Sequence, residues 1–325
     1  MSLRTAVIGA GSLGRQHARI HAALASEHAS QFITVCDINE ETARAVSAER
    51  NSDWTTDWRE LIGRVDAVSL AVPTEVHCEI ACGLLDAGIH VLVEKPISRT
   101  LEEADRMIAA AARSGAVLQI GHLERFNPAM VALRPHVRNP VYFEIHRIGE
   151  FTARSLDIDV VLDLMIHDLD IVQWLVGEDV EVTNIHAVGI PILTDKVDAA
   201  NARLEFSSGA VANITASRVG TEKIRKMRFF QPHDYVAIDY TTKHASVSSL
   251  AAPQAPGSWP VVHAKRLEIV DVEPLRAEIV SFFDSVNNGT AVAISGSDGR
   301  NALSLALRTL EQIKAHAEQL DVVHK

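Results

Sequence analysis

The sequence predicts an α/β protein of two domains: a doubly wound parallel sheet over residues 1–121, and an α+β domain with a large, mainly antiparallel open sheet over residues 122–325. In the first part, apolar runs alternate with amphipathic helices, which is typical of a parallel sheet covered on both faces. After residue 121 the runs become longer and alternate in polarity, as in antiparallel strands. The length of 325 residues also favours two domains.

Composition excludes several classes of protein. Hydrophobic residues make up 47% of the chain, which is too much for a disordered protein, and the net charge of −11 argues against a nucleic-acid partner. No stretch of about 18 apolar residues predicts a membrane span, and the N-terminal residues read as a strand and not as a signal peptide. The cysteines, Cys36, Cys78 and Cys82, are too few for a disulfide framework and match no zinc spacing. We expect a cytoplasmic protein without a metal.

Five strands and three helices are expected in the first domain. Each crossover between parallel strands is right-handed, so the sheet is doubly wound. One helix is bounded by two clear signals, Thr100 as N-cap and Gly115 just past its end. The strands are expected at 4–9, 31–37, 66–72, 89–94 and 116–121, and the helices from the glycines after residue 9 to about 27, at 75–87 and at 100–113.

The second domain is expected to hold six strands and three helices. The sequence SSG at 207–209 joins two of the strands and indicates a hairpin. An open sheet with one exposed face favours association with a second copy, so we expect a homodimer or homotetramer through this sheet. The strands are expected at 141–148, 180–190, 200–206, 210–219, 226–230 and 264–272, and the helices at 160–176, 275–288 and 298–319, the last opened by Ser297 or Asp298.

The pattern Gly9-Ala-Gly11-Ser-Leu-Gly14 follows the first expected strand and opens a helix, which is the context of a dinucleotide-binding Rossmann motif. Gly9 would make the tight turn, Gly11 would admit the pyrophosphate, and Gly14 would let helix and strand pack. Asp37 ends the second strand, where its carboxylate would accept hydrogen bonds from the adenine ribose and repel a 2′-phosphate. The sequence therefore predicts NAD as cofactor, in preference to NADP.

Three further segments follow parallel strands, at the sheet edge where such folds bind ligands. They are Ala71–His77, Glu94-Lys95-Pro96 and the run from Gly121 to Phe126. Lys95 follows a buried strand and precedes a proline, so its amine would project beside the nicotinamide, where partial desolvation lowers a lysine pKa. The alternative is a surface lysine at a strand end.

With these motifs, the later run Asp163-Leu-Met-Ile-His167-Asp-Leu-Asp170 resembles the glucose–fructose oxidoreductase/inositol dehydrogenase/MocA family. The resemblance spans nearly the whole chain, and it implies a Rossmann domain, a C-terminal sheet used for oligomerisation, and NAD-dependent oxidation of CH–OH groups. The cofactor-binding residues it implies, together with those of the glycine motif, are Gly9, Gly11, Ser12, Leu13, Gly14, Asp37, Ala71, Pro73, Thr74, His77, Glu94, Lys95 and Arg125. The substrate-binding residues are Lys95, His122, Arg125, Asp163, His167 and Arg218.

The resemblance makes Lys95 and His167 the catalytic pair, with Asp163 orienting His167. Asp163 and His167 are four residues apart and share a helix face, and Asp170 lies on roughly the same side. Alcohol oxidation needs one base for the hydroxyl proton; we favour His167, with Lys95 polarising the oxygen, although either residue can be the acceptor. Met165 stands where the family commonly has glycine, which predicts tighter packing at this point.

A basic run over residues 217–228 stands out in an acidic chain, with five basic residues against Glu222. Alternate positions of a strand face opposite ways, so part of the run is solvated; the rest, Arg218 first, would bind a diphosphate. Together with GHLERFNPA at 121–129 and DVVLDLMIHDLDIV at 159–172, this run resembles family members that oxidise C3 of UDP-N-acetylglucosamine to the 3-keto sugar in lipid A assembly. The expected substrate is therefore a UDP-sugar. Two alternatives stay open: a dehydrogenase of an unphosphorylated polyol such as myo-inositol, and a non-catalytic NAD(H)-sensing regulator.

Overall fold

The computed structural model describes residues 2–25, 27–151, 158–251 and 259–319. The chain forms two compact units. The first comprises residues 1–123 and 273–303, and the second comprises residues 124–272 and 304–325. The expected boundary at residue 121 thus lies close to the first crossing between the units. Residues 273–303, which the sequence places in the second domain, belong to the first unit.

The first unit contains a six-stranded parallel sheet in the order β3-β2-β1-β4-β5-β6, which confirms the doubly wound prediction. The order reverses between β1 and β4, and the carboxyl ends of these two strands form the switch point where such sheets bind ligands. The strands are β1 (Leu3–Ile8), β2 (Ser30–Cys36), β3 (Asp53–Thr55), β4 (Ala67–Leu70), β5 (His90–Glu94) and β6 (Leu118–Gly121).

Helices cover both faces of this sheet. Right-handed crossovers place α1 and α2 on one face, and α3 and α4 on the other, where α3 packs against α4. Thr100 caps α4 by accepting the N–H of Glu103, and Gly115 ends it at a φ of 74°, as the sequence predicts. The helices are α1 (Ser12–Leu24), α2 (Glu40–Arg50), α3 (His77–Asp86) and α4 (Leu101–Ser114), with short 3₁₀ turns η1 (Trp58–Leu61), η2 (Thr74–Val76) and η3 (Leu123–Phe126).

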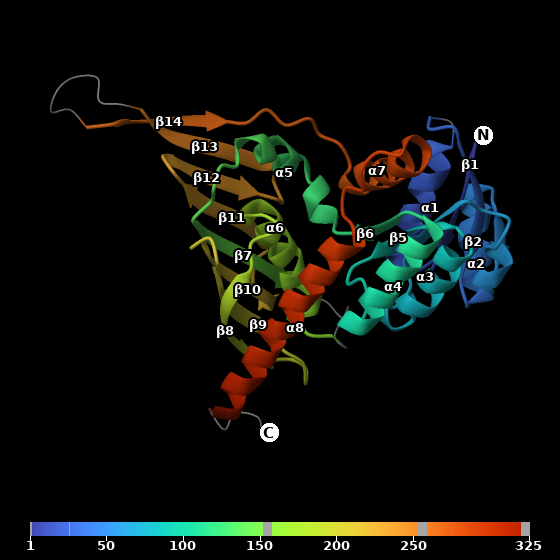
Figure 1. Ribbon diagram of the computed structural model, residues 1–325, viewed down its shortest axis with the longest axis horizontal. Coiled ribbons are helices and arrows are strands. Elements are labelled where there is room, and N and C mark those ends of the chain that lie inside the picture. Colours follow the sequence, from blue (N-terminus) through green and yellow to red (C-terminus); the bar gives the residue numbers. More distant parts are fainter. Residues whose placement is uncertain (1, 26, 152–157, 252–258, 320–325) are drawn as a thin grey trace. The chain divides into compact units, whose positions relative to one another are not determined.

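The chain returns to the first unit with α7 (Pro274–Asn288), which packs against α1 (Figure 1). Phe282 and Phe283 of α7 are fully buried against Ile20 and Leu24 of α1. The following residues add a backbone bridge to β6, since the N–H of Ile120 donates to the carbonyl of Ile294. These apolar contacts explain why residues 273–303 fold with the first unit.

The second unit is built on an eight-stranded sheet in the order β14-β13-β12-β11-β7-β10-β9-β8. All neighbours are antiparallel except β7 and β10, so the prediction of a mainly antiparallel sheet is confirmed. Side chains alternate between buried and exposed along β9 and β10, which leaves one face of the sheet open. The strands are β7 (Tyr142–Glu150), β8 (Val182–Ile190), β9 (Ala199–Phe206), β10 (Val211–Gly220), β11 (Ile224–Gln231), β12 (Asp234–Asp239), β13 (His244–Ala251) and β14 (Val261–Arg266).

Helices pack on the other face of this sheet. Figure 1 labels them α5, α6 and α8. The expected helix at 160–176 is present, but it begins with a π-helical turn, η5 (Val161–Met165), before α6 (Ile166–Val176). The last helix, α8 (Gly296–Gln319), begins earlier than expected because Ser295 and Asp298 cap it reciprocally. The remaining elements are α5 (Pro128–Leu133) and η4 (Arg134–His136). Among the described residues, no helix is long and apolar enough to cross a membrane.

Candidate active site

The glycine loop after β1 has the shape that a dinucleotide requires. A Cβ at Gly14 would lie 1.7 Å from the Gly9 carbonyl oxygen, and a Cβ at Gly9 would lie 2.4 Å from the Ala71 carbonyl oxygen, so both glycines are needed for packing. A Cβ at Gly11 would meet nothing within 4 Å. The open side of Gly11 lies at the N-terminus of α1, with Ser12 and Leu13 exposed beside it. This free space and the helix dipole fit the pyrophosphate of NAD.

Asp37 follows β2 and joins the glycine loop to the end of that strand. Its two carboxylate oxygens accept the backbone N–H groups of Ala10, at 2.6 Å, and Asn39, at 2.8 Å. The side chain is only partly buried, so each oxygen retains a free lone pair. Asp37 is therefore held in one orientation, in which it fits the predicted contact with ribose hydroxyls.

The loops after β4 and β5 are tied together by His77. Its imidazole is 1% exposed; Nε2 lies 2.9 Å from the Val72 carbonyl oxygen, and Nδ1 lies 3.1 Å from that of Pro96. Burial lowers the pKa of His77, although these carbonyls and Glu94 oppose the shift. His77 was expected to bind the cofactor, but its ring supports the two loops from inside. Ala71, Pro73 and Thr74 keep partial or full exposure at the sheet edge, as a cofactor contact requires.

Lys95 is partly exposed at the carboxyl end of β5, where the sequence places it. The neighbouring Glu94 does not share this exposure: its carboxylate is turned inward and lies 2.9 Å from His17 Nε2. The expected contact of Glu94 with the cofactor is thus not supported by its orientation. His122 follows β6 and is 1% exposed.

The π-helical turn carries the second group of expected catalytic residues. Asp163 lies within the turn and His167 lies just after it; both are partly exposed, whereas the flanking Met165 and Ile166 are fully buried. Turns of this kind recur at functional sites, because the extra residue per turn redirects side chains. Burial of Met165 agrees with the tighter packing expected at that position. Asp163 and His167 belong to the second unit, and Lys95 to the first.

Arg125 and Asp170 form a buried ion pair within the second unit. Arg125 donates to both oxygens of Asp170, at 2.9 and 2.7 Å, and its guanidinium lies over the ring of Trp174. His167 and Asp170 lie three positions apart within α6, in line with the expected shared side, but Asp170 is 2% exposed and pairs with Arg125. Arg125 was expected to bind cofactor and substrate, yet its fork is occupied by Asp170.

A second pair lies beside the first. Arg147 of β7 donates to both oxygens of Asp168, at 2.7 and 2.8 Å, and to Glu124, at 2.8 Å. Burial lowers the pKa of Arg147, but the two carboxylates outweigh it and hold that pKa well above its usual value. Charges buried in this way are stable only when fully paired, so Arg147 ties α6 to the sheet and Arg125 ties it to η3.

The basic run divides between the two faces of the sheet. Arg218 is 5% exposed and donates to the carbonyl of Ile158, with Asp198 at 3.6 Å, so its predicted contact with a diphosphate competes with partners inside the protein. Arg228 lies on the open face and pairs with Glu144. Arg225 lies on the helix-covered side of β11, partly buried.

Arg225 is not among the site residues expected from the sequence. Among the described residues its guanidinium makes no hydrogen bond and no ion pair. Burial lowers its pKa, and the charge of Arg147 adds to this, while Glu124, Asp168 and Asp163 partly offset both effects. The signal was present in the alternation Arg225-Lys-Met227-Arg-Phe229, which puts Arg225 on the same side as two core residues. A partly buried cation near Asp163 is suited to hold an anionic group.

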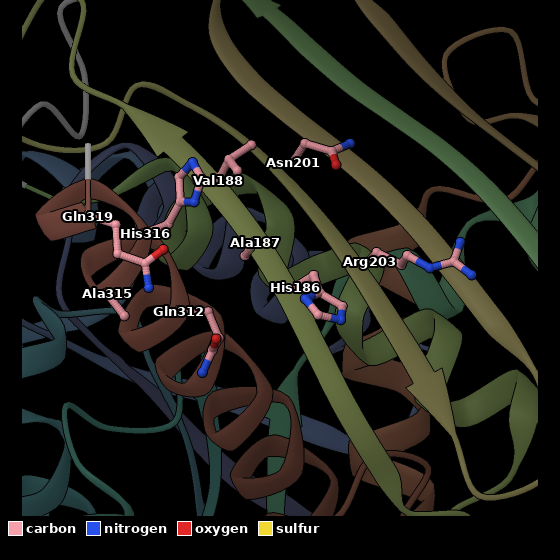
Figure 2. A pocket seen from close by; sticks show the side chains of 9 residues that line it. All are labelled: His186, Ala187, Val188, Asn201, Arg203, Gln312, Ala315, His316 and Gln319. Carbon is pink, nitrogen blue, oxygen red and sulfur yellow. The ribbon is translucent and has the colours of Figure 1, made fainter. Parts of the chain in front are cut away.

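A pocket of about 420 Å³ lies elsewhere in the second unit, between the edge strand β8 and the end of α8 (Figure 2). Its polar side chains come from both elements and from β9, and none of them is an expected site residue. It is lined by His186, Ala187, Val188, Asn201, Arg203, Gln312, Ala315, His316 and Gln319.

The glycine loop, the fixed Asp37 and the switch point together indicate a protein that binds a dinucleotide such as NAD. Residues 3–122 match the oxidoreductase family with an NAD-binding Rossmann fold, and residues 129–230 match the GFO/IDH/MocA C-terminal domain. The chain belongs to this Gfo/Idh/MocA family of oxidoreductases, which use NAD. An enzyme is thereby favoured over the regulator that the sequence left open.

Two curated relatives span nearly the whole chain. A UDP-N-acetylglucosamine 3-dehydrogenase of Acidithiobacillus ferrooxidans is 38% identical over 98% of this chain and 99% of its own length. An inositol 2-dehydrogenase of Rhizobium meliloti is 27% identical over 94% and 95%. The solved structure of the first enzyme superposes with a TM-score of 0.90 over 97% of this chain and 98% of that one. Levoglucosan dehydrogenase in complex with NADH and levoglucosan shares the fold, with a TM-score of 0.86 at 19% identity over 97% and 98%.

Proposed function

We propose that the protein oxidises a secondary hydroxyl of a sugar nucleotide, namely C3 of UDP-N-acetylglucosamine, and yields the 3-keto sugar and NADH. The observation that carries this proposal is Arg225, a partly buried guanidinium without a protein partner among the described residues, on the same side of the sheet as the Asp163 turn. A sugar diphosphate supplies an anion that this guanidinium can bind. The relative of 38% identity, which bears the name of that reaction, supports the same substrate.

His167, Asp163 and Lys95 have separate roles in the proposed oxidation. NAD, which the glycine loop and Asp37 would hold, would supply the acceptor for the hydride of the carbinol carbon. His167 takes the hydroxyl proton, because an imidazole changes charge near neutral pH, and Asp163 orients the ring and stabilises the imidazolium. Lys95 donates to the same oxygen and polarises it. The expected contacts of His122 and Arg218 with the substrate remain predictions.

The diphosphate defines how the substrate is held. A guanidinium binds phosphate oxygens through two parallel N–H donors, and such charge-assisted bonds contribute more than neutral ones. Arg225 therefore holds the nucleotide end, while the sugar reaches the catalytic groups. This arrangement favours UDP-N-acetylglucosamine over free N-acetylglucosamine.

A polyol such as an inositol is the second candidate, supported by inositol dehydrogenases among the relatives. A neutral polyol carries no anion, so it leaves Arg225 without a role. The deciding experiment measures NADH formation with UDP-N-acetylglucosamine, N-acetylglucosamine and myo-inositol. If the enzyme does not release NADH, a discharge assay measures the NADH that stays bound. Turnover of myo-inositol and none of the UDP-sugar would overturn the proposal.

We also propose that the open face of the second sheet joins copies of the chain into a homodimer or homotetramer in the cytoplasm. Large apolar side chains on that face support this: Val188 and Ile190 of β8 and Phe230 of β11 are 45%, 48% and 41% exposed. Light scattering of the wild type and of Phe230→Glu tests the assembly. A monomeric wild type would contradict it.

A further inference from the structure

Glu94 lies between His17 of α1 and the backbone of Lys95. Its Oε1 is 2.9 Å from Nε2 of His17, which is 0% exposed on α1. Its Oε2 accepts the backbone N–H of Lys95 at 3.3 Å. One carboxylate thus connects α1 to the residue that the proposed reaction needs.

The neighbouring strand leaves room for this carboxylate. Gly121 of β6 pairs with Glu94, and a Cβ at Gly121 would lie 3.0 Å from the carboxyl carbon of Glu94 and 3.0–3.1 Å from its oxygens. No side chain larger than hydrogen fits there without displacing the carboxylate. Gly121 therefore leaves the space that the inward carboxylate of Glu94 occupies.

A second buried acid faces the same region from α7. Glu278 is 0% exposed, and neither of its carboxylate oxygens has a hydrogen-bond partner among the described residues. Burial raises its pKa well above the usual value, and the charge of Glu94 raises it further. A proton retained on Glu278 avoids two adjacent buried charges.

The residues after Lys95 are held as well. His77 contacts the carbonyls of Pro96 and Ile97, at 3.1 and 3.3 Å. The lysine side chain itself has four rotatable bonds, and the backbone of Lys95 sets the point and the direction from which that side chain starts. Fixing that backbone on both sides is a way to place the amine.

We propose that Glu94 is a positioning residue, which, anchored by His17, fixes the backbone of Lys95 and so the direction of its amine. This inference rests on the role of Lys95 in the proposed function. Displacement of a catalytic group by about 1 Å costs about 10²-fold in rate, so the contact has a measurable effect.

The test compares Glu94→Ala, Glu94→Gln and His17→Leu with His21→Leu. His21 is a matched control: it lies one turn further along α1, is 0% exposed, and makes one comparable contact, at 2.9 Å, with Ser69 Oγ. Glu94→Ala and His17→Leu are expected to lower kcat by about 10- to 100-fold, with little change in NAD affinity. Glu94→Gln retains an oxygen that accepts the Lys95 N–H and keeps most of the activity. His21→Leu keeps its kcat.

A second readout needs no cofactor. The rate at which an amine-acylating reagent modifies Lys95 in the cofactor-free protein, relative to the exposed Lys265 and measured by mass spectrometry, is expected to change in Glu94→Ala and His17→Leu but not in His21→Leu. Unchanged kcat and acylation in Glu94→Ala and His17→Leu would overturn the positioning role. So would an equal loss in His21→Leu, since that marks a general loss of packing. If Lys95→Met itself retained turnover, the proposed function would fail first.

Discussion

Arg225 of β11 stands directly opposite Arg147 of β7 in the antiparallel pairing. Two like charges at opposed positions destabilise a sheet unless each has a counter-charge. Arg147 has Asp168 and Glu124, whereas Arg225 has no such contact among the described residues. Arg225 is therefore available to bind an anionic ligand.

Arg225→Met is expected to raise KM for UDP-N-acetylglucosamine about 10- to 150-fold, which corresponds to the loss of one charge-assisted contact of about 1.5–3 kcal/mol. Arg228→Met on the opposite face is the matched control, because Arg228 pairs with Glu144. Steady-state kinetics on both variants decides the matter. Equal KM values for the two variants would remove Arg225 from substrate binding.

Replacement of Asp37 by Ser is expected to narrow the preference for NAD over NADP. In the wild type the carboxylate opposes a 2′-phosphate by roughly 1–3 kcal/mol, the scale of a partly buried charge clash. Titration of both cofactors by fluorescence measures the gap. A wild type that binds the two equally would show that Asp37 only holds the loop.

Lys95→Met and His167→Ala are each expected to reduce turnover by about 10²–10⁴-fold, the usual effect of losing a positioned acid or base. NAD affinity is expected to persist in both. Asp163→Asn, which disturbs orientation without removing the base, is expected to cost less than His167→Ala. Near wild-type turnover in His167→Ala would leave His167 without a catalytic role.

Gly11→Ala and Gly14→Ala are expected to fail in different ways. A Cβ at Gly11 meets open space, so Tm stays near that of the wild type while NAD affinity falls about tenfold or more, because the methyl group occupies the approach of the pyrophosphate. A Cβ at Gly14 collides with the Gly9 carbonyl, so Tm falls. Calorimetry and NAD titration separate the two effects. Unchanged NAD affinity in Gly11→Ala would mean that the loop is only a turn.

Stability is expected to depend on pH through Glu278. Its folded-state pKa is raised, so between the usual carboxyl pKa of 4.5 and the folded value the unfolded chain has lost a proton that the native protein keeps. This contribution is complete below the unfolded pKa and is lost as pH rises, by about 1.4 kcal/mol per pH unit. Glu278→Gln removes the dependence, so its free energy of unfolding, measured in urea from pH 5 to about 8, should improve relative to the wild type as pH rises. A constant difference would contradict the shift.

The sequence was most informative where the signals are local. Thr100 and Gly115 mark both ends of α4 because a cap and a left-handed glycine act within one turn of the helix. β12 and β13 were not predicted, since their turns place His233 and Lys243 at φ values of 68° and 50°. These positions usually carry glycine or asparagine, so the pattern lacked its turn signal.

Sequence patterns do not reveal contacts between residues that are far apart in the chain. Arg125 and Asp170 are 45 positions apart, and only the fold shows that they satisfy each other. The same holds for Glu278, which sequence spacing does not connect to Glu94. The glycine loop and Lys95 could be located because strand ends converge at one edge of a parallel sheet. Arg225 and Arg218 face the same side of the sheet, and only their partners separate them: Arg218 donates to the Ile158 carbonyl and lies near Asp198, whereas Arg225 makes no such contact among the described residues.

The place of β7 in its sheet has a consequence for how the chain folds. β8, β9 and β10 form one meander, and β11 to β14 form another, each from strands adjacent in sequence. β7 lies between the two groups and pairs with β10 and β11, although it leaves the ribosome before either of them. During synthesis the edge that pairs with β10 stays free until Gly220 has emerged, and the edge that pairs with β11 stays free until Gln231 has emerged. We therefore expect β7 to be the last strand to gain protection from hydrogen exchange, and its capture to be the step that makes the two meanders one cooperative sheet.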